Sequence, residues 1–146
     1  MKAIKLMFGG VCALVLSSCS KEEVVLVAPV IEFVSLTPAS VTELVDELTL
    51  KIKYSDPDGD LGENSPDVTN LFITDSRTSV KYAFRVQQLA PDNAGIAIEG
   101  SLSVNIDALL ISDGSTSETG TFSILIKDRA GNESNTITSS AFTIVK

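Results

Sequence analysis

The sequence predicts an all-β protein, a seven-stranded β-sandwich that follows a short N-terminal export signal. Apolar and polar residues alternate along several segments, with the period of two that is typical of half-buried strands. Clusters of Asp, Pro, Gly and Asn separate these segments. No segment shows a convincing helical period. Short alternating strands at regular spacing favour a sandwich.

The export signal precedes the predicted domain. A cationic start is followed by an apolar stretch, residues 6–16, which is too short to cross a membrane. Ser17 and Ser18 are the small residues that a signal peptidase requires before Cys19. This ending resembles a bacterial lipobox, which implies cleavage before Cys19 and lipid attachment to its thiol. The predicted segments are a lipoprotein signal peptide, a lipidated tether and a β-sandwich, at residues 1–18, 19–29 and 30–146.

A second address signal follows the cysteine. Lys21, Glu22 and Glu23 lie two to four positions after Cys19. This run resembles the export signal of Bacteroidota lipoproteins, which implies a lipid-anchored outer-membrane protein exposed at the cell surface. If the run is only a polar linker, the protein faces the periplasm instead. In both cases the lipid on Cys19 is the expected contact with the membrane.

Turn residues bound the first four predicted strands. The first strand lies between Pro29 and the Thr37-Pro38 pair. The second shows the clearest alternation, with four apolar residues on one face between residues 48 and 54. A polar turn at 75–77 joins the third strand to the fourth. The predicted ranges are 30–37, 47–55, 69–75 and 79–88.

The last three predicted strands follow longer connections. The fifth strand follows the turn at 90–95 and carries alternating apolar residues up to Ile106. The polar stretch 112–120 is expected to be a flexible loop. In the sixth strand three apolar residues share one face, and the seventh follows the turn at 130–132. The predicted ranges are 96–107, 120–127 and 136–145.

The turn before the last predicted strand supports a more specific fold. Residues 127–134 read Lys-Asp-Arg-Ala-Gly-Asn-Glu-Ser. They resemble the D-x-A-G-N-x-S turn of many bacterial immunoglobulin-like domains. The order of long and short loops is likewise similar to immunoglobulin-like and fibronectin type III domains. This resemblance covers residues 30–146 and implies a fold rather than a function. The chain has no Trp, so the core Trp of antibody-type domains is missing. Their cysteine pair is missing too, because Cys12 is expected to leave with the signal peptide.

The strongest chemical signal is an acidic loop after the second predicted strand. Asp56, Asp58 and Asp60 stand at alternate positions, and Gly59 and Gly62 permit tight curvature. Alternate carboxylates can converge on one centre, and calcium takes about six to eight oxygen ligands in irregular geometry. The loop therefore predicts a calcium site. A solvated acidic turn is the alternative, because Asp, Pro and Gly also form ordinary turns.

Three further acids are expected near this site. Glu63 lies in the same loop, and Asp67 lies at the offset of the closing acid of an EF-hand. Leu61 stands where an EF-hand has Gly, so the loop is not an EF-hand. In an immunoglobulin-like sandwich, the loop with Asp128 and the start of the first strand lie at the same end. The predicted calcium ligands are Asp56, Asp58, Asp60, Glu63, Asp67 and Asp128.

The composition excludes several classes of function. The chain has 11 Lys and Arg against 19 Asp and Glu, a net charge of −8, which disfavours nucleic-acid binding. It has no His, the commonest general base and zinc ligand. No Gly-x-Ser-x-Gly motif occurs. We therefore expect no enzyme activity and no catalytic residues; a carboxylate pair is the remaining catalytic alternative.

The sequence thus predicts a non-catalytic surface lipoprotein. Its sandwich would display loops for protein contact or serve as an accessory subunit, with calcium as the cofactor. The alternative is a glycan-binding lipoprotein that accompanies a nutrient-uptake system. Sugar stacking would depend on a small aromatic supply, since the chain has two Tyr, six Phe and no Trp.

Overall fold

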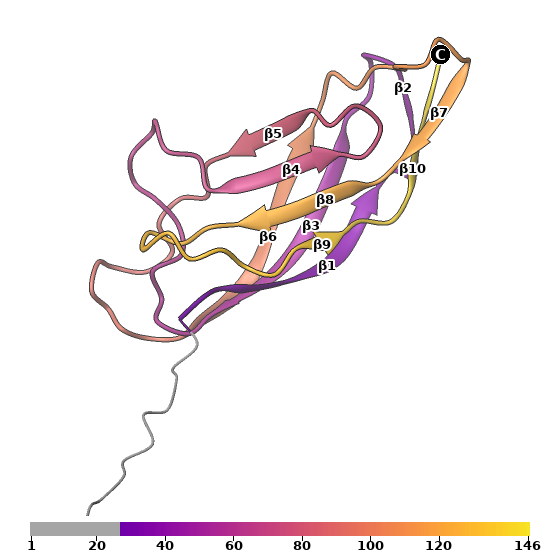
Figure 1. Cartoon of the computed structure of the whole chain (residues 1–146). Coiled ribbons are helices and arrows are strands. Elements are labelled where there is room, and N and C mark those ends of the chain that lie inside the picture. Colours follow the sequence, from indigo (N-terminus) through magenta and orange to yellow (C-terminus); the bar gives the residue numbers. More distant parts are fainter. Residues whose placement is uncertain (1–26) are drawn as a thin grey trace, which may run out of the picture.

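The computed structural model describes residues 27–146, which form two facing β-sheets and a third, smaller sheet at one end (Figure 1). The signal peptide and Cys19, Lys21, Glu22 and Glu23 lie outside the described residues, so their roles stay predictions. Residues 27–146 include no helix with the length and apolarity that a membrane crossing requires.

The described residues form ten strands, and they confirm the predicted all-β, sandwich-like fold. The two large sheets have the orders β1-β3-β6 and β5-β4-β8-β9, and the small sheet has the order β2-β10-β7. All neighbours are antiparallel except β2 and β10, which are parallel. The strands are β1 (Val30–Thr37), β2 (Ser40–Thr42), β3 (Leu48–Asp56), β4 (Leu71–Asp75), β5 (Lys81–Phe84), β6 (Ile98–Ile106), β7 (Ser117–Gly120), β8 (Phe122–Ile126), β9 (Ile137–Thr138) and β10 (Phe142–Val145).

The core lies between the large sheets and consists of the inward members of the alternating strands. In β3, Leu48, Leu50 and Ile52 are almost completely buried. The rings of Phe122 and Phe142 stack with centroids 4.5 Å apart and join β8 to β10. Burial of apolar area, at roughly 25 cal/mol per Å², is the main force that holds the sheets together.

Two short strands were not predicted from the sequence. Residues 117–120, expected within a flexible loop, form β7 and pair with β10. Its inward positions hold Glu118 and Gly120 rather than apolar residues. Glu118 pairs with the guanidinium of Arg77, and a Cβ at Gly120 would lie 2.6 Å from Cγ and Cδ of Arg77. The hydrophobic pattern is therefore absent from β7. The other unpredicted strand, β2, has three residues and pairs with β10.

The predicted last strand is divided into β9 and β10. Ser139 lies at the break, where its N–H donates to Phe122 O and its Oγ accepts from Phe122 N, both at 2.9 Å. The chain then leaves β8 and joins β7 and β2. Ile137 and Phe142 are an odd number of residues apart, so the apolar alternation changes phase between the two strands.

The two ends of the sandwich carry different loops (Figure 1). The described chain enters at the end where Val30 of β1 pairs with Ser55 of β3. We call this end the acidic pole; it carries the loops 57–70, 85–97 and 127–136. We call the opposite end the distal pole; it carries the loops 43–47, 76–80 and 107–116. The predicted meeting of the acidic loops at the end where the first strand begins is therefore present.

Candidate functional site

The candidate site begins where β3 ends. Alternation along β3 places Asp56 on the same face as Leu50 and Ile52, and its side chain is completely buried. Asp56 Oδ2 accepts a hydrogen bond of 2.7 Å from the backbone N–H of Leu61. This carboxylate therefore closes the loop that carries Asp58 and Asp60.

Two glycines allow this loop to lie against the 85–97 loop. Gly59 and Gly62 have φ values of +73° and +94°, a region that L side chains rarely adopt. A Cβ at Gly59 would lie 2.2 Å from the carbonyl oxygen of Ile96, and one at Gly62 would lie 2.2 Å from that of Gln87. Both positions require glycine for conformation and for close backbone approach.

Asp56, Asp58 and Asp60 converge on one centre. One carboxylate oxygen from each lies within 4.8 Å of the other two. Within residues 27–146, the Oδ1 atoms of all three are buried, and none has a hydrogen-bond partner. Leaving a buried acceptor unpaired costs about 1–3 kcal/mol, and more for a charged group. Three such atoms at one place are a group that could hold a positive ion.

The ionisation of two members of this cluster, Asp56 and Asp60, is disfavoured. Burial, together with the neighbouring Asp58 and Asp60, raises the pKa of Asp56 to about 6, against the lowering effect of the hydrogen bond from Leu61. Burial and the charges of Asp128 and Asp58 likewise raise the pKa of Asp60. Both shifts show that the fold destabilises the carboxylate forms, an effect that a bound cation would reverse.

The acidic loop is also joined to the turn before β9. Asp60 accepts two hydrogen bonds from that turn: its carbonyl from the N–H of Arg129 at 3.3 Å, and its Oδ2 from the N–H of Ala130 at 3.1 Å. Arg129 Nη1 donates to the carbonyl of Gly62 at 3.0 Å. The position of Asp60 therefore depends on two loops that are far apart in sequence.

The other predicted ligands have different surroundings. Both carboxylate oxygens of Asp128 accept hydrogen bonds from Asn132, one from its backbone N–H and one from its side-chain amide. Glu63 Oε1 accepts from the N–H of Ser65 at 2.9 Å. Asp67 is exposed. The structure thus brings together three of the predicted ligands and places Asp128 beside them as a charged neighbour of Asp60.

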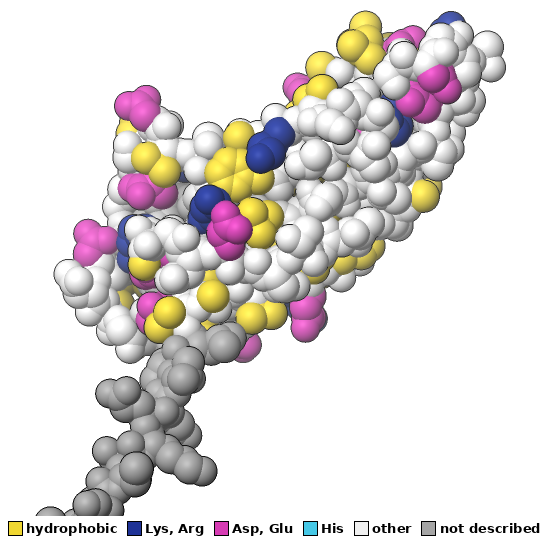
Figure 2. Space-filling view, in the orientation of Figure 1, with side chains coloured by type: hydrophobic (Ala, Val, Ile, Leu, Met, Phe, Trp, Pro, Cys, Tyr) yellow, Lys and Arg dark blue, Asp and Glu magenta, His cyan; other side chains and the backbone are white. Residues whose placement is uncertain are grey.

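A cleft of about 610 Å³ opens beside the cluster. The acidic loop, residues 92–95 and Arg129 form its walls. The Nε of Arg129 lies 3.7 Å from the carboxylate of Asp92. None of the described residues that line this cleft is aromatic. Figure 2 shows acidic side chains on this end of the molecule.

The donor set suits a hard cation. Carboxylate-only sites favour calcium, magnesium or manganese over zinc, which prefers nitrogen and sulfur ligands. Calcium bonds of about 2.4 Å place ligands on opposite sides of the ion up to about 4.8 Å apart. Magnesium usually keeps several water ligands. The carboxylates of Asp56, Asp58 and Asp60 could therefore hold a hard divalent cation.

Comparison with known proteins gives no relative for this chain. No protein-family model, no curated protein and no solved structure matches it.

Proposed function

We propose that this protein is a non-catalytic, lipid-anchored envelope protein whose β-sandwich is stabilised by calcium at the acidic pole and displays its loops for protein contact. The observation that carries the calcium assignment is the convergence of three buried, unpaired carboxylate oxygens from Asp56, Asp58 and Asp60. A cation between them compensates repulsion that the described protein groups leave in place.

Calcium acts as a joint between loops in this proposal. Asp56 belongs to the end of β3, and Asp60 is hydrogen-bonded to the turn at Arg129 and Ala130. Binding at the cluster therefore fixes the acidic loop against the turn before β9. The first strand also begins at this pole, since Val30 pairs with Ser55, the residue before Asp56. The cation thus stiffens the base from which the sandwich projects.

Calorimetric titration of the mature chain with calcium tests this assignment, with Cys19 replaced by Ser for solubility. We expect saturable binding of one calcium ion. At about 100-fold excess over Kd, the ion adds about 2.7 kcal/mol to the unfolding free energy, or about 10 °C in Tm. Asp58→Asn removes both effects.

Asp67→Asn is the matched control, because Asp67 is an exposed acid in the same loop and outside the cluster. It retains calcium binding. The absence of binding heat at millimolar calcium, together with an unchanged Tm, would refute the calcium site.

The anchor is supported by the sequence run that ends in Cys19 and continues with Lys21, Glu22 and Glu23. We expect Cys19→Ala to release the protein from the membrane fraction. Replacement of residues 21–23 by neutral residues leaves it lipidated but protected from protease added to intact cells. Unchanged protease accessibility of that variant would contradict the export signal, and unchanged membrane association of Cys19→Ala would contradict the anchor.

A further inference from the structure

Large apolar side chains are exposed at the distal pole, opposite the end where the described chain begins. Val45 is 75% exposed and Leu44 61% exposed, and Val80 and Leu110 are about half exposed. Val80 lies in the turn before β5. Figure 2 shows apolar side chains at this end of the molecule, with acidic side chains around them.

These residues belong to neighbouring loops that touch one another. The N–H of Leu44 donates to the carbonyl of Leu109 at 3.1 Å, which joins the 43–47 loop to the 107–116 loop. Val80 and Leu110 line one cavity of about 240 Å³, together with the ring of Tyr82. The exposed residues therefore form a surface with a recess, in contrast to single apolar residues scattered over a protein. We call it the apolar tip.

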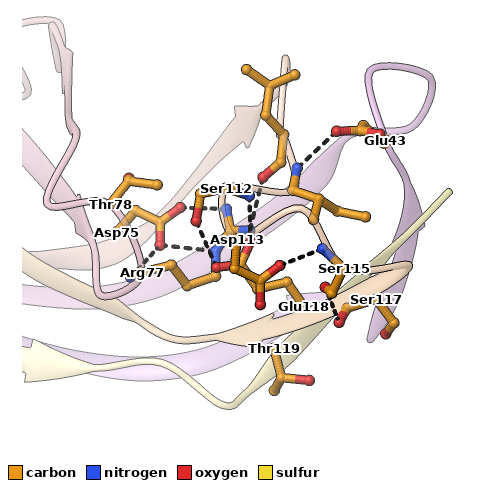
Figure 3. Close-up of polar contacts among 12 residues, drawn as sticks. Glu43, Asp75, Arg77, Thr78, Ser112, Asp113, Ser115, Ser117, Glu118 and Thr119 are labelled. Atoms are coloured by element: carbon orange, nitrogen blue, oxygen red, sulfur yellow. Dashed lines mark hydrogen bonds and ion pairs between the residues drawn. The ribbon is translucent and has the colours of Figure 1, made fainter.

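A polar network centred on the buried side chain of Arg77 holds the apolar tip in position (Figure 3). Arg77 Nη1 donates to the carbonyl of Leu110 at 2.9 Å and also pairs with Glu118 at 3.1 Å. The N–H of Ile111 donates to Glu43 Oε1 at 2.9 Å. The backbone on both sides of the tip is therefore fixed by charged groups. A rigid surface loses less conformational entropy when it binds a partner.

The backbone at the tip is also strained. Leu44 and Ala108 have φ values of +58° and +53°, although neither is glycine. Residues with side chains occupy this left-handed region at a cost of roughly 1–2 kcal/mol. Such strain persists where the surrounding structure imposes it and is concentrated at functional sites.

The charge around the apolar tip determines the kind of partner. Asp46, Glu47, Asp107 and Asp113 are exposed in the same loops. Among the described residues they outnumber the exposed cations beside these loops, which are Lys146, hydrogen-bonded to Thr116, and Lys81, the residue after Val80. A second copy of this chain, tip to tip, would bring like charges together. A protein with a basic rim would instead be attracted and oriented.

We propose that the apolar tip is a docking surface for a different protein, which presents an apolar side chain surrounded by Lys or Arg. The apolar side chain enters the recess beside Val80 and Leu110, and the basic rim faces the acids of the distal loops. This interaction rests on the proposed display function and names the surface that makes the contact. It does not require the cation at the acidic pole.

Photo-crosslinking in cells of the source organism tests this surface. A benzoylphenylalanine at Val45 is compared with one at Ser103, an exposed position on the outer face of β6. We expect a discrete heavier adduct from position 45 and none from position 103. Leu110→Asp in the position-45 protein lowers the adduct at least tenfold, with an unchanged Tm. Raising salt to about 0.5 M before irradiation also lowers it, because salt screens the rim charges.

Three outcomes would overturn the docking surface. They are equal adducts from both positions, no adduct from position 45, and an adduct composed of two copies of this chain. The calcium and Cys19 experiments give separate results. Retained calcium binding and membrane anchoring without a position-45 adduct would remove the apolar tip alone.

Discussion

Buried carboxylates are paired at one pole of this sandwich and incompletely paired at the other. At the distal pole, the carboxylate of Asp75 is buried and both of its oxygens accept hydrogen bonds from Arg77, the shortest at 2.6 Å. At the acidic pole, Asp56 is equally buried, but its Oδ1 has no partner among the described residues. The same side chain is thus paired with an internal cation at one end, whereas at the other end one of its oxygens has no partner among the described residues.

The absence of a nearby arginine does not explain why Asp56 Oδ1 is unpaired and Asp75 is paired. Arg129 lies beside the acidic cluster, yet its guanidinium donates to Gly62 O and lies nearest the carboxylate of Asp92. At the distal pole, Arg77 reaches two acids and packs over the ring of Phe142, 5.1 Å from its centroid. The cluster thus keeps unpaired carboxylate oxygens although an arginine lies close by, and this is the observation on which the proposed cation site rests.

The largest expected effect comes from removing the internal cation. Arg77→Met leaves Asp75 buried without its partner, and breaking a buried ion pair in this way costs about 3–5 kcal/mol. Asp75 and Glu118 also raise the pKa of Arg77 against the effect of its burial. Urea unfolding of the metal-free protein measures the loss.

Arg85→Met is the matched control, because Arg85 donates only to backbone carbonyls, the nearer being Asn64 O at 3.0 Å. Its loss costs about 1 kcal/mol. Equal destabilisation by the two substitutions would contradict the special status of the Arg77 network.

The acidic pole predicts an unusual dependence of stability on pH. Burial raises the pKa of Asp56 to about 6 in the folded state, above its ordinary value of 3.8. Between these values the folded protein holds the proton more tightly than the unfolded protein, so metal-free stability falls as pH rises through this window. Saturating calcium favours the carboxylate and removes the fall. The melting temperature from pH 4 to 7, with chelator or with calcium, measures both trends.

Asp56→Asn isolates the contribution of Asp56 to the pH dependence. The other charges at the site remain: the cluster members Asp58 and Asp60, and the neighbouring Asp128 and Arg129. The variant retains a side-chain oxygen for the N–H of Leu61 but has no proton to titrate in this range. The fall in metal-free stability should therefore be smaller in the variant. Parallel curves for the variant and the parent protein would assign the pH dependence to other groups. Glu118 makes the opposite contribution to the pH dependence of stability. Hydrogen bonds from Ser112 lower its pKa, so the stability that it contributes is lost as the pH falls.

Neutralising one aspartate should have opposite signs at the two poles. Asp58→Asn relieves repulsion in the metal-free cluster and adds about 1 kcal/mol to the unfolding free energy. Asp75→Asn removes a charged partner of buried Arg77 and lowers that free energy by about 2–3 kcal/mol. Urea unfolding in chelator compares the two variants directly. A loss of stability in metal-free Asp58→Asn would show that the three carboxylates do not repel one another in solution.

The sequence predicted the acidic pole better than the distal pole, for a physical reason. Asp56, Asp58 and Asp60 lie within one turn, so their spacing alone indicated that they could converge. The partners Arg77 and Glu118 are 41 positions apart, and no local pattern relates them. The same limit explains β7, whose inward positions hold Glu118 and Gly120 rather than apolar residues because both face the side chain of Arg77.

Spacing was less informative where it was taken from another kind of loop. Asp67 was predicted from its EF-hand offset, which assumes flanking helices, whereas this loop joins two strands. After Gly62 the chain turns to the 84–86 segment, since Glu63 N donates to Val86 O and Asn70 N to Phe84 O. Asp67 lies in the exposed part of the loop between Glu63 and Asn70. Within the strands that form, prediction of the inward faces succeeded because alternation is a property of each strand alone.

The smallest expected effect separates distance from burial as the source of ion-pair strength. Lys127 and Glu133 at the acidic pole lie 2.7 Å apart, with side chains 40% and 54% exposed. Arg77 and Asp75 lie 2.6 Å apart, with side chains 4% and 1% exposed. We expect Glu133→Gln to cost less than about 0.5 kcal/mol in urea unfolding, and high salt to abolish that cost. A cost near that of Arg77→Met would mean that contact distance, rather than exclusion of water, sets the energy of both pairs.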